Sequence, residues 1–186
     1  MTILQVDKLS KHFGGLVAVS SFNIQLEHGE LLGLIGPNGS GKTTVFNMIT
    51  GLYKPTEGRI QFDSKDITGL RPDRITAFGI SRTFQNIRLF SQLSVLDNVK
   101  VGCNLRLRSS PIAAAFGLPG YRREEEEMDR ESTRLLERVG LADVAQEEAG
   151  GLPYGLQRKL EIARALATHP KLLLLDEPAA GMNPAE

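Results

Sequence analysis

Cysteine, net charge and long apolar runs are all scarce in this sequence, and each shortage excludes a class of protein. The single cysteine, Cys103, excludes an internal disulfide and a cysteine-rich metal site, and it suits a reducing cytoplasm. Its simplest role is that of a small packing residue. The 22 basic and 22 acidic side chains give a formal net charge of zero, so no global field draws the protein to nucleic acid or anionic lipid. Any such partner must be met through a local patch, and we expect no nucleic-acid partner.

The hydrophobic residues are spread along the chain. No segment approaches the roughly 20 apolar residues of a membrane span, and the N-terminal stretch "MTILQVDKLSKHFGG" lacks the apolar centre of a signal peptide. With 41% hydrophobic and 24% charged residues, the 186-residue chain has the composition of a soluble protein with one sizeable core. At a membrane, such a chain would work as a peripheral subunit.

Hydrophobic periodicity in the first third of the chain predicts strands and one helix. Residues 2–7 and 17–27 alternate between apolar and polar, which favours two antiparallel strands around the turn "KHFGG". Residues 30–35, "ELLGLI", are nearly continuous in apolar side chains, the pattern of a strand covered on both faces. Residues 43–50 have helical spacing and stop at a glycine, and residues 53–67 indicate a turn and a short strand pair.

Helical patterns dominate the later part. A helix is predicted to begin near Ser94, and residues 109–120, "SSPIAAAFGLPG", form a connection punctuated by Pro and Gly. The segment 121–141 places apolar side chains on one helical stripe, formed by Met128, Leu135, Leu136 and Val139. Its "EEEE" run is most simply a solvated face.

A further periodic helix, "GLQRKLEIARALATHP", starts at Gly155 and is followed by "KLLLLDEP", a second buried strand. We interpret residues 89–151 as a helical lobe inserted in an α/β core made of residues 1–88 and 152–186, all within one domain.

The segment "GPNGSGKT" matches the complete phosphate-loop pattern G-x-x-x-x-G-K-S/T, between an expected strand and an expected helix. Glycines let the backbone approach a pyrophosphate with its N–H groups pointing inward. Lys42 would reach the outer phosphates, and the Thr43 hydroxyl would ligate Mg²⁺. The expected ligand is a nucleoside triphosphate with Mg²⁺. The candidate contacts are Gly36, Pro37, Asn38, Gly39, Ser40, Gly41, Lys42, Thr43 and Thr44.

Two acidic residues follow the second buried strand. Ligands bind at the carboxyl ends of strands in open α/β sheets, where Asp176 and Glu177 are expected to lie. In a phosphate-loop site, the first carboxylate orients a water of the Mg²⁺ shell, and the second can polarise the attacking water as a general base. Adjacent acids at a strand end can also be a simple polar turn.

The order of four segments carries a resemblance to a known family. "GPNGSGKTT", "RTFQNIRLF", "LPYGLQRKLEIARAL" and "LLLLDEPAAGMNP" together resemble the ATP-binding subunit of an ABC transporter over the whole chain. Within that superfamily, "TFQNIRLF", "LSVLDNV" and "LDEPAAGMNP" are similar to the larger ATPase subunit of branched-chain amino acid importers. The resemblance implies a P-loop NTPase fold of the α/β class, with an N-terminal antiparallel β subdomain and an inserted α-helical subdomain.

The resemblance also implies partners and a location. Such a subunit hydrolyses ATP as a homo- or heterodimer beneath two membrane permease subunits, at the cytoplasmic face of the cell membrane, and serves a substrate-binding protein indirectly. The transported substrate is chosen by those other subunits.

Two single residues acquire roles from the resemblance. Gln85 would contact Mg²⁺ and its water shell at the hinge between the core and the helical lobe. Phe13 would stack on adenine. Without the neighbouring motifs, a surface glutamine in a loop would be the preferred interpretation of Gln85. Phe13 could equally be a core residue.

The family signature, typically L-S-G-G-Q, is represented here by "PYGLQ". Tyr154 takes the place of the serine and Leu156 that of the second glycine, while Gly155 and Gln157 match. By resemblance, this segment binds the γ-phosphate of the ATP held by the opposite subunit, where backbone N–H groups and the helix dipole can act.

Two further segments have implied contacts. "GMNPAE" resembles the D-loop, with Asn183, which passes signals across the dimer. Residues 85–98 would face the coupling helix of the membrane subunit, or their apolar members would simply pack in the lobe. Those members are Ile87, Leu89, Phe90 and Leu93.

The family's domain continues beyond this point with a strand that ends in a histidine that senses the γ-phosphate. His12, His28 and His169 all precede the acidic pair Asp176 and Glu177, so none matches that histidine. We therefore expect the chain to be truncated at its C-terminus, without the final core strands. Two alternatives to a transport ATPase remain, a non-catalytic nucleotide-binding module and a soluble ABC ATPase that acts on DNA or ribosomes.

Overall fold

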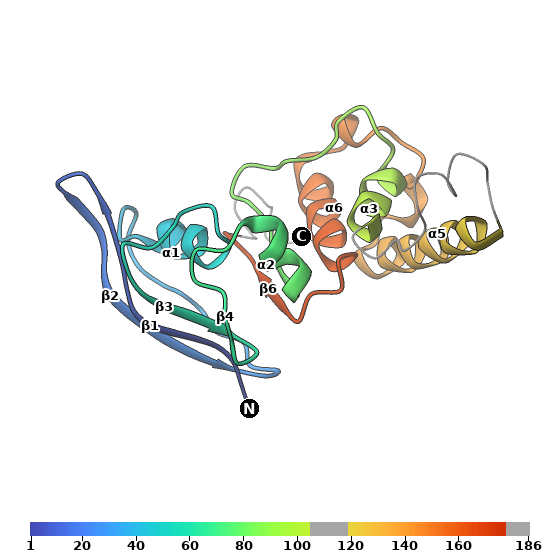
Figure 1. Cartoon of the computed structure of the whole chain (residues 1–186). Coiled ribbons are helices and arrows are strands. Elements are labelled where there is room, and N and C mark those ends of the chain that lie inside the picture. The colour runs from blue at the N-terminus through green and yellow to red at the C-terminus, as the bar shows by residue number, and fades with distance from the viewer. Residues whose placement is uncertain (105–118, 178–186) are drawn as a thin grey trace. The chain divides into compact units, whose positions relative to one another are not determined.

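The computed structural model describes residues 1–104 and 119–177. The chain divides into two compact units, Met1–Ile80 and Ser81–Glu186, and Figure 1 labels the elements of both. The predicted partition into a core of 1–88 with 152–186 and a lobe of 89–151 stays a prediction.

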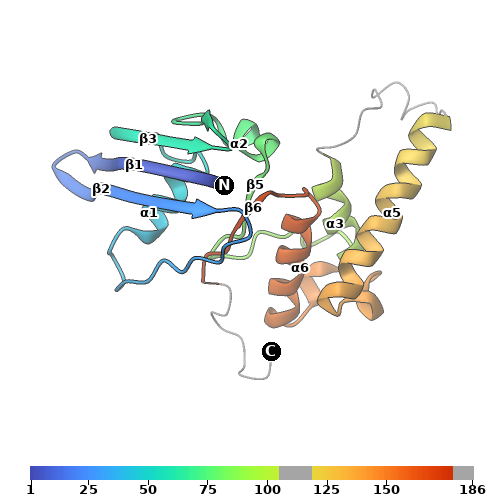
Figure 2. The same ribbon diagram turned by 90° about the horizontal axis from the view of Figure 1, so that it is seen from below.

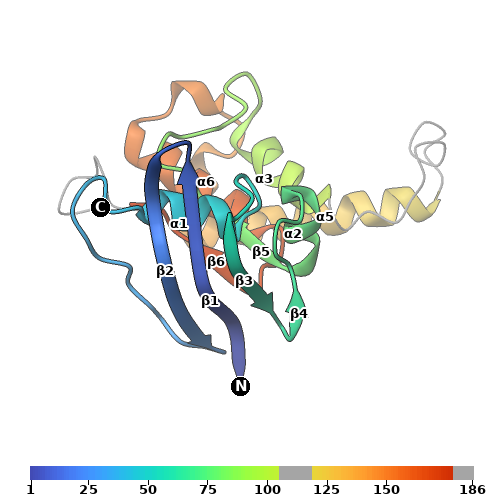
Figure 3. The same cartoon turned by 60° about the vertical axis from the view of Figure 1, so that its left-hand side comes forward.

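The first unit contains an antiparallel sheet of four strands. They are β1 (Thr2–Phe13), β2 (Leu16–Glu27), β3 (Glu57–Phe62) and β4 (Lys65–Asp66), in the order β2-β1-β3-β4 (Figure 3). The hairpin predicted around "KHFGG" is confirmed, and β1 is twice as long as its alternating segment. The short strand pair predicted within residues 53–67 is also confirmed.

The core of this unit lies between the sheet and two short helices, α1 (Lys42–Ile49) and α2 (Pro72–Phe78). Leu9, Ile60 and Phe62 from the strands are fully buried, as are Met48 from α1 and Ile75 from α2. The helix predicted after the glycine loop is thereby confirmed, because its apolar stripe is the face that packs. Sequence periodicity did not predict α2, which spans only seven residues and begins with a proline.

The strand predicted at residues 30–35 is wrong. This segment has no regular secondary structure, and the side chains of Leu31 and Ile35 are 97% and 94% exposed. An apolar run reports a tendency to be buried, whereas a strand also needs a neighbour that pairs with its N–H and C=O groups. Within the described residues, no strand pairs with this segment.

Three helices form the core of the second unit. They are α3 (Val95–Cys103), α5 (Pro119–Val139) and α6 (Tyr154–Leu166), and Figure 2 shows α3 between the other two. Short 3₁₀ turns lie at Ala142–Val144 and Ala149–Gly151. The side chains of Val99, Leu136 and Leu160, one from each helix, are fully buried together.

The sequence predicted this helical packing well. The side chain of Ser94 caps α3 by accepting the Asp97 N–H at 3.0 Å, which is where the helix was expected to begin. The predicted stripe of α5 contacts the core through Leu135 and Leu136, and Cys103 is buried there as a packing residue.

A second sheet pairs β5 (Ile80–Arg82) with β6 (Leu172–Leu174). The strand predicted before the acidic pair is confirmed, and Leu172 and Leu174 are buried in it. Most of the predicted 109–120 connection, and the "GMNPAE" segment with Asn183, lie outside the described residues. Among the described helices, none combines the length and the apolar character that crossing a membrane requires.

Candidate functional site

The backbone of the glycine loop turns at two glycines with positive φ angles. Gly39 and Gly41 have φ angles of 82° and 92°, in the left-handed region that glycine adopts without strain. A Cβ on Gly41 would lie 2.7 Å from the Ala18 carbonyl oxygen, and one on Gly36 would lie 2.7 Å from Ser40 Oγ. The loop therefore folds closely on itself at Gly36 and against β2 at Gly41, where an added Cβ would meet a backbone oxygen.

The N-terminus of α1 presents donors without a competing anion. The helix begins at Lys42, its N-cap Gly41 has no side chain to cap it, and its first turn contains no acidic residue. Helix N-termini with these properties attract phosphate through their N–H groups and dipole. Lys42 Nζ donates to the carbonyl oxygens of Gly36 and Pro37 at 2.6 and 2.9 Å, so its ammonium group already lies within the loop.

A cavity of about 430 Å³ lies beside this loop, within the volume range of small-molecule sites. Residues 34–37 and 40–42 of the loop form one side, and β2 forms the other through residues 17–20 and Phe22. Sequence reasoning missed Val17, Ala18 and Ser20 as candidate contacts. Their position directly after the "KHFGG" turn carries no motif that could have identified them.

The cavity does not extend to Phe13. This residue ends β1, is 43% exposed, and packs its ring edge-to-face with Tyr53 at a centroid distance of 5.3 Å. Lys11 Nζ lies 5.0 Å from the centroid of the same ring. The alternative that Phe13 is a core residue is wrong, and its contact with adenine stays a prediction.

Alanine substitutions at two loop glycines are expected to differ in effect. Gly39→Ala introduces only an unfavourable positive φ, a cost of about 1–2 kcal/mol, because nothing lies within 4 Å of the place that its Cβ would take. Gly41→Ala adds the close approach to Ala18 and is expected to displace the loop and weaken nucleotide binding further. Thermal unfolding and titration with a fluorescent ATP analogue test this. Equal losses of thermal stability and of nucleotide affinity in the two variants would contradict this prediction.

Gln85 and Glu177 were predicted from separate motifs, and the second unit brings them together. Gln85 Nε2 donates to Glu177 Oε2 at 3.2 Å. Glu177 also has a φ angle of 49°, a left-handed conformation that is unfavourable for a residue with a side chain. Such strain gathers at functional sites, where surrounding contacts hold it in place.

The other predicted carboxylate, Asp176, is buried and paired. Its Oδ2 accepts from Arg82 Nη2 at 2.7 Å, and the side chains are 7% and 4% exposed. Arg82 was missed by sequence reasoning, although it stands only three residues before Gln85. Its charge compensates a buried carboxylate that would otherwise be costly.

The predicted metal-binding residues have the right chemistry for magnesium. Thr43, Gln85 and Asp176 supply a hydroxyl, an amide and a carboxylate oxygen, the hard donors that Mg²⁺ takes alongside water and phosphate. Within residues 1–104 and 119–177, no group of three His, Cys, Asp or Glu side chains could hold a metal ion by itself.

The signature segment forms the first turn of α6. The helix begins at Tyr154, whose side chain is 45% exposed, while Gly155 is buried. Gln157 Nε2 turns back and donates to the Leu152 carbonyl oxygen at 2.8 Å. Leu156 is partly buried and packs against the helical core.

The apolar residues of segment 85–98 divide between two environments. Leu89 packs against the helical core, whereas Phe90 and Leu93 are 49% and 38% exposed. Asn98 holds the backbone of this segment, accepting from the Phe90 N–H and donating to the Phe90 carbonyl oxygen, both at 3.0 Å. Leu89 therefore fits the interpretation as lobe packing, whereas the exposed Phe90 and Leu93 leave partner contact open.

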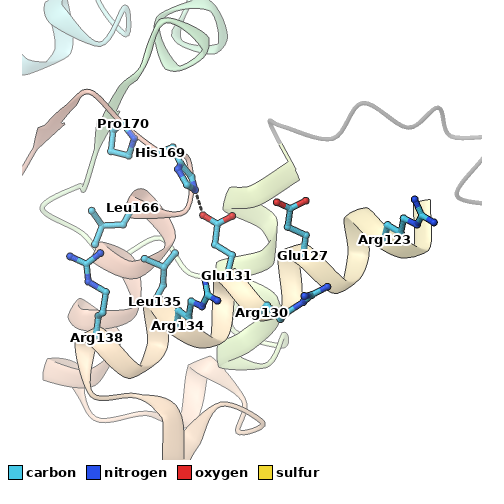
Figure 4. A pocket seen from close by; sticks show the side chains of 10 residues that line it. All are labelled: Arg123, Glu127, Arg130, Glu131, Arg134, Leu135, Arg138, Leu166, His169 and Pro170. Atoms are coloured by element: carbon cyan, nitrogen blue, oxygen red, sulfur yellow. Dashed lines mark hydrogen bonds and ion pairs between the residues drawn. The ribbon is translucent and has the colours of Figure 1, made fainter. Parts of the chain in front are cut away.

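A second cavity, of about 840 Å³, contains none of the predicted site residues (Figure 4). Charged side chains of α5 line it, together with residues that follow α6. Glu131 pairs with His169 across it, and Arg130 pairs with Glu126 on the same helix. The candidate residues therefore remain those of the glycine loop in the first unit and, separately, those that follow β6 in the second.

Similar sequences and structures are found among known proteins. The family described as ABC transporter matches residues 19–180. The chain is 46% identical over 184 residues to the high-affinity branched-chain amino acid transport ATP-binding protein BraF of Pseudomonas aeruginosa, covering 99% of this chain and 72% of that protein. It is also 46% identical over 185 residues to LivG of Escherichia coli, a protein with the same description, with the same two coverages.

The solved structures that are similar to this chain include ATP-binding cassettes. An ATP-binding cassette of an ABC transporter, MJ1267, in its ADP conformation matches with a TM-score of 0.83 and 38% identity, covering 100% of this chain and 72% of that one. A dimeric, post-hydrolysis structure of the cassette MJ0796, bound to ADP and Pi, matches with a TM-score of 0.81 and 28% identity, covering 98% and 77%.

Proposed function

The chain belongs to the ABC transporter family, and from this premise we propose that it hydrolyses ATP to energise an importer of branched-chain or related amino acids. The observation that carries the catalytic part is the end of β6. There the chain leaves the sheet with two adjacent carboxylates, and the Gln85 amide contacts the second of them at 3.2 Å. A carboxylate held in this way can accept a proton from water.

Each site residue has a distinct task in the proposal. The backbone of the glycine loop and the first turn of α1 bind the phosphates, and Lys42 neutralises the outer ones. Glu177 accepts the proton of the attacking water, and Gln85 orients that carboxylate. Mg²⁺, when bound, neutralises charge that develops on the phosphates. Thr43, Gln85 and Asp176 would hold it.

The assignment to amino acid import rests on the relatives. Both BraF and LivG are described as branched-chain amino acid transport ATP-binding proteins, and their match covers 99% of this chain. The dimeric structures of MJ0796 support pairing with a second ATPase subunit. In such a pair, the nucleotide of that second subunit would be contacted by Tyr154, Gly155 and Gln157. The proposal also includes binding to membrane permease subunits and a peripheral position at the cytoplasmic face of the membrane.

An uptake assay tests this function. Deletion of the gene from its own organism is expected to abolish high-affinity uptake of radiolabelled leucine, isoleucine or valine. A plasmid copy is expected to restore uptake, whereas a Glu177→Gln copy is not. Uptake of lysine serves as the control for general effects on energy metabolism. Undiminished leucine uptake in the deletion strain would contradict the transport assignment, and phosphate release by the purified protein tests ATP hydrolysis separately.

A further inference from the structure

A buried ion pair on α6 has no task in the function proposed so far. Arg158 Nη1 donates to Glu161 Oε2 at 2.7 Å, and the two side chains are 0% and 2% exposed. Removing two charges from water is costly, and packed apolar side chains of similar volume often serve stability as well or better. Stability alone therefore does not explain why this ion pair is buried here.

The guanidinium group of Arg158 holds the backbone of both predicted catalytic segments. Its Nη2 donates to the carbonyl oxygens of Asp176 and Glu177 at 2.7 and 2.9 Å, and its Nη1 also donates to the Phe84 carbonyl oxygen. Phe84 directly precedes Gln85. One side chain thus joins the segment that carries the glutamine to the segment that carries the general base.

Glu161 completes this arrangement from the other side. Its Oε1 accepts the Phe84 N–H at 3.1 Å, while its Oε2 orients Arg158. Both polar backbone groups of Phe84 are therefore held by the ion pair. The segment before Gln85 is fixed to α6 by charge-assisted hydrogen bonds, which are shorter and stronger than neutral ones.

The contact with two successive carbonyls also accounts for the strained backbone at the base. Successive carbonyls of an extended strand point to opposite sides, so a single nitrogen cannot normally donate to both. The turn at Glu177, with its φ angle of 49°, brings both carbonyls toward Arg158. The hydrogen bonds that Arg158 donates compensate the unfavourable conformation.

We propose that Arg158, oriented by Glu161, is a positioning residue that holds Gln85 and Glu177 in the mutual geometry needed for hydrolysis. The inference rests on the proposed function. Arg158 lies one turn after Tyr154 in the same helix, so the residue that positions the base shares a rigid element with the segment expected to meet the partner's nucleotide.

The test replaces the whole pair, because one charge left alone in the interior would destabilise the fold. In Arg158→Met with Glu161→Met, kcat for phosphate release is expected to fall about 100-fold, the cost of a small misplacement of catalytic groups. Affinity for a fluorescent ATP analogue is expected to stay within about threefold, since the phosphate loop is unchanged. A double variant that retains wild-type kcat and loses only thermal stability would overturn the proposal.

Two single variants make the test independent of the double variant's folding. Arg158→Lys keeps the charge opposite Glu161, but one ammonium cannot reproduce the planar fork, so we expect a folded protein with kcat between the wild type and the double variant. Wild-type kcat in Arg158→Lys would also overturn the proposal. Arg138→Met is the control, an exposed arginine of α5 outside the ion pair, and its kcat is expected to be unchanged.

Phosphate release by the wild-type protein tests the proposed function, and the kcat of the Arg158 variants tests the positioning role. Absence of phosphate release by the wild-type protein would remove the proposed function itself. Normal release by the wild type, with equal kcat in the Arg158 variants, would remove only the positioning role.

Discussion

Replacing Glu177 by glutamine is expected to reduce phosphate release by about 10²- to 10⁴-fold, the usual contribution of a general base, while ATP binding is retained. The amide has nearly the shape of the carboxylate, and its oxygen can still accept from Gln85 Nε2, which lies 3.2 Å from Glu177 Oε2. The substitution removes the ability to take a proton and little else. The loss should therefore appear in kcat, with the affinity for ATP unchanged.

The matched control for this variant is Glu137→Gln, which makes the same chemical change at an exposed position of α5. Phosphate release and binding of a fluorescent ATP analogue are measured on both proteins with Mg²⁺. If Glu177→Gln keeps more than about a tenth of the wild-type turnover, Glu177 is not the base, because general-base loss costs at least about 100-fold.

The Lys42→Ala variant is expected to bind ATP about 10- to 150-fold more weakly. This range corresponds to the roughly 1.5–3 kcal/mol of a hydrogen bond to a charged group. In the structure, the Lys42 ammonium group contacts two loop carbonyls at 2.6 and 2.9 Å, so it is already placed among the groups that would surround a phosphate. Its removal takes away the positive charge and leaves the loop's own carbonyls facing an anionic ligand.

The control is Lys54→Ala, an exposed lysine of the same unit. Titrations at low and high salt separate a local contact from a general charge effect, since exposed charges are screened by salt much more than a bound pair is. Equal losses in the two variants would show that Lys42 acts only through the net charge of the protein.

Local patterns predicted most of the fold because they report local preferences. The hairpin of β1 and β2, the helix that begins at Lys42 and the capped start of α3 all follow from alternation, spacing or a cap residue within a few positions. The expected strand at residues 30–35 failed for the opposite reason. Its apolar side chains are a local property, whereas strand pairing depends on a neighbour far away in the sequence.

Local motifs identified one part of the candidate site, and the residues they missed depend on long-range contacts. The phosphate loop, Gln85 and Glu177 were identified from motifs. The structure places the last two in contact, and their roles stay predictions. Arg82, Arg158 and Glu161 were missed, because each is an ordinary charged residue until its long-range partner is known. On a helical wheel, Arg158 and Glu161 are two polar positions three residues apart, a spacing that usually indicates an exposed ion pair.

The left-handed backbone at Glu177 has a consequence for how this position can evolve. Glycine adopts such a conformation without the roughly 1–2 kcal/mol that other residues incur, so a more stable protein would carry glycine here. Glycine has no carboxylate, however, and could not serve as the base. If Glu177 is the base, stability and turnover therefore place opposite demands on residue 177.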